Sequence, residues 1–208
     1  MDQNQEHLKN LSEIRSLMER SSSFMSLSGL SGIISGILGI AAFIYAYTVL
    51  HPFYEMLDGF IFSAEKKKDT IVLFFLLAVV LLIIVFAEVI YLTARKAKKK
   101  GLPVWDNSAK RMLINLFIPL VTGGVFCLIL VYHEAFKLIP SSMLLFYGLA
   151  LLNTSKYTLP DIRYLGLSEL FFGLLAAFWL NLGLWFWVAG FGLMNIFYGI
   201  VMYLKYER

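Results

Sequence analysis

Four polar side chains in or beside apolar stretches of this chain are the best placed for chemistry: Glu88, Arg111, Asn115 and Glu169. Charged and amide groups are costly inside a membrane, so they usually have a reason to be there. Counted along their apolar stretches, all four lie at a similar depth on one side. We expect either interhelical hydrogen bonds, with Glu88 paired to Arg111 or snorkelling outward to the membrane surface, or a cytoplasm-facing polar pocket for a cation, a proton or a small solute.

A second pair of polar side chains is predicted near the end of the chain. Asn181 and Asn195 are each seven residues from Val188, where we place a tight turn. Two helices joined there would bring the amides to the same depth, where they could bond to each other.

The chain carries none of the sequence signatures of common enzyme sites, such as GxSxG, HExxH, CxxC, a P-loop or GxGxxG. Two His and Glu pairs, His51 with Glu55 and His133 with Glu134, fall in predicted outer loops. No motif fixes their spacing, so we expect polarity at the membrane interface rather than a metal site or a pH sensor there. We predict a protein that is not an enzyme and that has no cofactor and no metal centre.

The composition indicates that lipid surrounds much of the protein. Of the 208 residues 59% are hydrophobic and 15% are charged, and the mean hydropathy is +0.74. A soluble domain has about a quarter charged residues, and so large an apolar excess cannot be hidden inside one small globule. The net charge is +4, and its basic residues flank apolar stretches. This arrangement favours anionic lipid headgroups over nucleic acid as the partner.

The orientation follows from one junction. The apolar stretch Thr70–Ala87 precedes the strongly basic stretch Arg95–Arg111, which is typical of a helix leaving the membrane on the cytoplasmic side. The predicted fold is all-α, a polytopic bundle of about six transmembrane helices after an amphipathic N-terminal helix. We place the helix at 1–23 and the membrane domain at 24–208, with spans at 25–50, 70–94, 112–132, 141–154, 167–186 and 188–204. Both termini are then cytoplasmic, in a bacterial inner membrane.

The N-terminal segment is polar but has one apolar helical stripe, formed by Leu8, Leu11, Ile14, Leu17 and Met18. Such a helix either lies on the membrane surface or docks a partner or a second copy.

Small residues recur at helical spacing in the first span, at Gly29, Gly32, Gly36 and Gly39. Missing side chains allow another helix to approach closely, so this face packs within the chain or forms a dimer.

Pro119 interrupts the third span. A proline inside a helix removes one hydrogen-bond donor and leaves the carbonyl four residues earlier, here that of Asn115, without its helical partner. Protein or water must satisfy that group.

The fourth span is short, so it must be extended by its flanks, be tilted little or cross the membrane only in part.

Several runs together resemble a family of uncharacterised bacterial integral membrane proteins with six spans. They include Leu17–Ser22, Ser28–Gly32, Leu120–Gly124, Ser155–Leu159 and Asp161–Gly166. The resemblance covers nearly the whole chain. It implies the six-helix fold and no assigned activity, so it transfers no functional residues.

Two functions follow as hypotheses. The first is a non-enzymatic sensor or scaffold that contacts a partner through its cytoplasmic helix and loops. The alternative is a small oligomeric carrier or channel for an ion or small solute that uses the cytoplasm-facing pocket.

Overall fold

The computed structural model describes residues 28–57, 64–99 and 107–206, and over these ranges the regular structure is helical, without a strand. The all-α prediction is confirmed for this part of the chain. The predicted amphipathic helix at 1–23 and the centre of the basic loop lie outside the described residues.

In the part of the chain that the structure describes, five long helices are followed by a composite one. The first five are α2 (Gly29–Leu57), α3 (Ala64–Lys99), α4 (Asn107–Tyr132), α5 (Ile139–Thr154) and α6 (Asp161–Phe178). The composite helix consists of α7 (Gly183–Trp187), the π-helical segment η4 (Val188–Met194) and α8 (Asn195–Tyr206). Short 3₁₀ turns lie at Phe136–Leu138 (η1), Ser155–Tyr157 (η2) and Leu180–Leu182 (η3).

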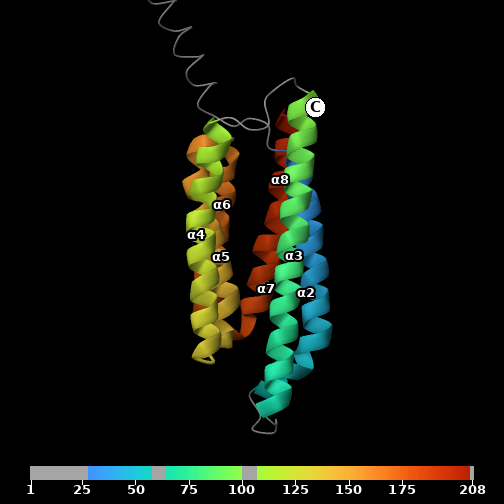
Figure 1. The fold of residues 1–208 in the computed structure, drawn as a ribbon, viewed down its shortest axis with the longest axis vertical. Helices are drawn as coiled ribbons and strands as arrows, with labels where there is room; N and C mark the ends of the chain where they lie inside the picture. The colour runs from blue at the N-terminus through green and yellow to red at the C-terminus, as the bar shows by residue number, and fades with distance from the viewer. Residues whose placement is uncertain (1–27, 58–63, 100–106, 207–208) are drawn as a thin grey trace, which may run out of the picture.

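These helices run side by side along the long axis in two groups (Figure 1). The α4 group consists of α4, α5 and α6, with α5 packed between the other two. The α2 group consists of α2, α3 and α8, and in it α2 contacts both others. The segments α7 and η4 contact members of both groups, so the composite helix joins them.

Within the described residues, four helical stretches are long and apolar enough to cross a membrane: Leu76–Lys99, Asn107–Tyr132, Phe136–Tyr157 and Leu180–Tyr206. The third contains the short fourth span, which its two flanking 3₁₀ turns extend to 22 residues. At 1.5 Å per residue this run is about 33 Å long, close to the thickness of the hydrocarbon layer. The flanking turns thus lengthen this helical stretch beyond the predicted 141–154.

Several helices continue past the predicted ends of the spans. The helix α2 runs on to Leu57, and α3 begins at Ala64 and ends at Lys99. The predicted bounds followed hydropathy, and helical hydrogen bonds continue beyond the apolar core because they do not depend on lipid.

The predicted turn at Val188 is wrong. The chain instead turns between Phe178 and Gly183, where Trp179 leaves helical geometry (φ −108°, ψ 77°), and Val188 lies inside the composite helix. The fifth helix begins at Asp161, six residues before the predicted span, and it ends at Phe178, eight residues before the predicted end. Uniformly apolar sequence on both sides of the turn hid this shift.

The glycine face of α2 packs within the chain. A β-carbon at Gly36 would lie 2.6 Å from the carbonyl oxygen of Gly192, and one at Gly39 would lie 2.9 Å from that of Phe191. Gly29 and Gly32 face Gly199 in the same way. Of the two alternatives for this face, the structure therefore has the intramolecular one, with backbone against backbone.

A second glycine crossing holds the α4 group together. A β-carbon at Gly148 of α5 would lie 2.8 Å from the Gly166 carbonyl oxygen of α6. Beside this crossing an apolar core joins α5, α6 and α8, and its buried members are Leu151, Leu159, Ile162, Leu165 and Met202. The two helix groups thus share a core as well as a connecting helix.

Candidate functional site

The carboxyl group of Glu169 lies fully buried in α6, where the two helix groups meet. Its Oε1 accepts a hydrogen bond from Asn195 Nδ2 of α8 at 3.4 Å. Its Oε2 has no hydrogen-bond partner among the described residues, although the side chain is 0% exposed. The carboxyl group occupies the space that a β-carbon at Gly190 would need, and Leu144 Cδ2 borders the same space. A buried, half-partnered carboxyl group of this kind is costly and unusual.

Asn195 connects this carboxyl group to the neighbouring helices. Its Nδ2 also donates to the carbonyl oxygens of Gly190 at 3.4 Å and Phe191 at 3.2 Å, both in η4. Its Oδ1 accepts a hydrogen bond from the hydroxyl of Tyr147 in α5 at 3.1 Å. We call Tyr147, Glu169, Gly190, Phe191 and Asn195 the Asn195 junction. One amide thus holds α5, α6 and η4 to α8.

The π-helical geometry of η4 belongs to this junction. A π-helical turn is rare and is often found at functional sites. Gly190 and Gly192 are buried in this segment, where any side chain would meet Glu169 or Ile40. The Asn195 amide bonds to two carbonyl groups of the segment, and the Phe191 ring stacks on Tyr147 at 4.8 Å between centroids. The widened turn is therefore held by polar and aromatic contacts from the junction.

The predicted four-residue cluster does not form. Glu88 accepts a hydrogen bond from Ser35 of α2 at 3.2 Å and does not pair with Arg111, which is exposed on α4. Asn115 donates to the Arg111 carbonyl oxygen within α4, and Glu169 belongs to the Asn195 junction. Similar depth along the sequence did not determine which helix faces meet.

The predicted pairing of Asn181 with Asn195 is also wrong. Asn181 lies in η3 at the turn, where its Oδ1 accepts a hydrogen bond from Lys137 at 3.5 Å. Asn195 lies mid-helix and bonds to Tyr147 and Glu169. The pair depended on the turn at Val188, so it is lost with that turn.

The carbonyl group freed by Pro119 is satisfied by a residue that was not among those predicted. Asn153 Nδ2 of α5 donates to the Asn115 carbonyl oxygen at 3.0 Å. The prediction that protein or water must satisfy this group is confirmed. The sequence did contain a signal for Asn153. It is an amide at the end of the predicted span 141–154, which lies at the same end of the bundle as Asn115 at the start of the span before it.

We expect Asn153→Ala to destabilise the protein by about 1 kcal/mol, because it leaves the Asn115 carbonyl without a donor. In a Pro119→Ala background the backbone N–H of residue 119 can donate to that carbonyl, so the same change should cost clearly less. The free energy of unfolding in SDS titrations measures both. An equal cost in the two backgrounds would contradict this role of Asn153.

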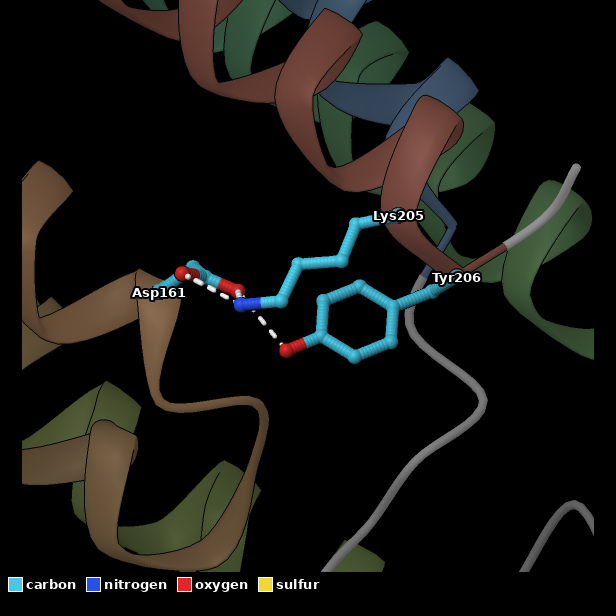
Figure 2. Close-up of polar contacts among 3 residues, drawn as sticks. All are labelled: Asp161, Lys205 and Tyr206. Atoms are coloured by element: carbon cyan, nitrogen blue, oxygen red, sulfur yellow. Dashed lines mark hydrogen bonds and ion pairs between the residues drawn. The ribbon is translucent and has the colours of Figure 1, made fainter.

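A polar clamp joins the start of α6 to the end of α8 (Figure 2). Lys205 Nζ lies 2.9 Å and 3.2 Å from the two carboxylate oxygens of Asp161, and the Tyr206 hydroxyl donates to Asp161 Oδ2 at 2.8 Å. Partial burial acts to raise the pKa of Asp161, but the hydrogen bonds from Lys205 and Tyr206 and the Lys205 charge lower it by more. The clamp therefore favours the ionised carboxylate, and with it the contact between the two helix groups.

The sign of the pH dependence follows from this lowered pKa. The clamp stabilises the folded protein fully above the ordinary pKa of aspartate, about 3.9, and its contribution is lost as the pH falls through the folded value. We expect Asp161→Asn to lower the melting temperature slightly at neutral pH, because Lys205 is exposed and screened by water. The difference from the wild type should vanish in acid. A difference that persists below both pKa values would refute the assignment.

Basic side chains gather at the end of the bundle that holds this clamp. In the described part of the chain they include Arg95, Lys98 and Lys99 of α3, Lys110 and Arg111 of α4, Lys156, Arg163 and Lys205. We call this the basic end. Lys137 lies at the opposite end, beside η3, and the backbone of Lys66–Lys68 begins α3 there.

The residues that the structure describes contain no group of three His, Cys, Asp or Glu side chains that could hold a metal ion. His133 and Glu134 follow α4 at the turn before η1, and the side chains of His51 and Glu55 lie outside the described ones. The chemistry available at the Asn195 junction is therefore that of one carboxyl group, one amide and one phenol.

Comparison with known proteins identifies no relative. No family model, curated protein or solved structure matches the chain. Its resemblance to six-span bacterial membrane proteins stays a prediction, and its function is inferred from the Asn195 junction.

Proposed function

We propose that the chain is a non-enzymatic protein of the bacterial cytoplasmic membrane that crosses it six times, with both termini inside. Four stretches have the required length and hydropathy, and α2 and α6 run beside them in the same bundle. The basic end supports the orientation, because clustered Lys and Arg favour the cytoplasmic side. The basic stretch Arg95–Arg111, which includes the end of α3 and the start of α4, then faces anionic headgroups, where each cation contributes about 1 kcal/mol.

Within this topology we propose a sensor or scaffold. The single observation that carries it is the Asn195 junction, a buried polar contact placed where two helix groups meet and a π-helical turn interrupts the connecting helix. A change at the junction would alter the register of η4, and so the position of α8 and the α2 group relative to the α4 group. The clamp at Asp161 lies at the other end of α8, where this shift would reach the cytoplasm. The predicted N-terminal helix and cytoplasmic loops would contact a partner or a second copy.

Distances between the helix groups test this proposal. In a Cys127→Ser background, spin labels at the exposed positions 83 of α3 and 121 of α4 report on the two groups. The protein in lipid nanodiscs is measured across pH, salt and lipid composition. A sensor gives two distance populations whose ratio depends on conditions.

A matched control uses labels at 121 and 149, both exposed and both within the α4 group. Their distance should not change. One fixed distance between the groups under every condition would refute the sensor.

A small oligomeric carrier or channel is the second candidate, and Glu88 favours it. This second carboxyl group lies between α2 and α3, and its Oε1 has no hydrogen-bond partner among the described residues. Two intramembrane carboxyl groups in one small protein are typical of ion pathways. Ion or proton flux into proteoliposomes that contain the purified protein would support this alternative. Flux no greater than into protein-free liposomes would reject it.

A further inference from the structure

We propose that Glu169 is a proton-binding site and that its protonation is the signal to which the Asn195 junction responds. This inference rests on the proposed sensor function and names its stimulus. The step transfers one proton from a hydronium ion of the solvent to the Glu169 carboxylate. One O–H bond of the hydronium ion breaks and leaves water, one O–H bond forms on the carboxylate, and one negative charge is removed from the interior.

The surroundings of Glu169 offer little to compensate a negative charge. Leu144 of α5 and Gly190 of η4 border the carboxyl group with carbon atoms. Among the described residues, the carboxyl group of Glu169 accepts one hydrogen bond, from the Asn195 amide of α8, and no Lys, Arg or His contacts it. Tyr147 of α5 is the other titratable side chain of the Asn195 junction, and its hydroxyl donates a hydrogen bond to Asn195. A charge that is buried without a counterion is costly, and a proton removes that cost.

The same packing favours a proton over a metal ion. A hard cation needs several oxygen ligands, at about 2.0–2.6 Å for Mg²⁺ and Ca²⁺. Even a single β-carbon on Gly190 would meet both Glu169 Oε2 and Leu144 Cδ2, and the Asn195 NH₂ group faces Oε1. A proton needs no additional space.

The Asn195 amide connects protonation to the helices. Its NH₂ group is shared between Glu169 Oε1 and the carbonyl oxygens of Gly190 and Phe191 in η4. Hydrogen bonds to a charged acceptor are stronger than those to a neutral one. Protonation of Glu169 therefore weakens the hydrogen bond from the Asn195 amide to Oε1. The amide then bonds more strongly to the carbonyl oxygens of Gly190 and Phe191 in η4. The π-helical turn is the element whose geometry depends on the balance between these bonds.

Difference infrared spectroscopy of the full-length protein in lipid, recorded between acid and alkaline pH, tests the assignment. We expect a carboxylic acid C=O band that titrates and is lost in Glu169→Gln, which keeps the shape of the side chain. The band should persist in Glu88→Gln, the matched control at the other intramembrane carboxyl group. A titrating band unchanged in Glu169→Gln would overturn the inference.

A measurement without substitution covers the case in which Glu169→Gln fails to fold. In wild-type protein labelled with ¹³C-carboxyl glutamate, the acid band must shift in frequency. Absence of an isotope-sensitive acid band would overturn the inference.

The two proposals fail in different ways. A Glu169 band that titrates while the distance between labels at 83 and 121 stays constant supports the proton site and refutes the sensor. Two distance populations whose ratio does not depend on pH support the sensor and overturn the proton as its stimulus.

Discussion

Gly199→Leu is expected to lower the free energy of unfolding by about 3 kcal/mol or more. A β-carbon at this position would lie 2.6 Å from the backbone nitrogen of Ile33, 2.8 Å from the carbonyl oxygen of Gly29 and 2.9 Å from the carbonyl carbon of Gly32. All three are backbone atoms, so no side chain can rotate away. The helices α2 and α8 must separate, which removes the close packing that holds helices together in lipid.

Gly124→Leu is the matched control. Gly124 is an exposed glycine in the middle of α4, and a β-carbon there would meet nothing within 4 Å. This change should be neutral or slightly stabilising, because leucine favours a helix over glycine. Unfolding of the detergent-purified proteins in SDS measures both variants. If both variants lost a similar free energy of unfolding, the contact between α2 and α8 would not be the cause of the destabilisation.

The second large effect is expected for Asn195→Ala, which should cost about 2–4 kcal/mol. Truncation leaves Glu169 Oε1 without its donor and the Tyr147 hydroxyl without its acceptor, both in the interior. It also opens a cavity beside η4. The melting temperature of the detergent-purified protein should fall accordingly.

A double-mutant cycle separates these causes. Tyr147→Phe alone should cost about 1 kcal/mol, because it removes the hydroxyl donor and keeps the ring that stacks on Phe191. Combined with Asn195→Ala it should cost less than the sum of the two, since no unpartnered hydroxyl group remains. Additive costs would contradict the bond between Tyr147 and Asn195.

Predictions from the sequence were most accurate where the cause is local. A proline in a helix frees one particular carbonyl group, and the carbonyl of Asn115 is bonded from outside its helix. Glycines at helical spacing remove side chains from one face, and that face is the one in backbone contact. Hydropathy located the apolar stretches because solvation by lipid depends on composition.

Predictions failed where the outcome depends on how two helices meet. Moving the last turn from Val188 to Trp179–Leu182 changes the depth of every later residue, and the pairing of Asn181 with Asn195 is lost with it. Glu88 and Glu169 lie at similar predicted depths but on helices of different groups, and each bonds to a different neighbour. Depth along one helix says nothing about its rotation toward the others.

The amino-acid sequence was therefore enough to establish the helical class of this protein, the stretches that lipid can solvate and the backbone group that needed an outside donor. All three follow from covalent geometry and solvation, which act within one segment. The meeting of Tyr147, Glu169 and Asn195 against a π-helical turn became visible only in the packed molecule. Their contact depends on the rotation and register of several packed helices, and these are set by the sum of many weak contacts that no single segment contains.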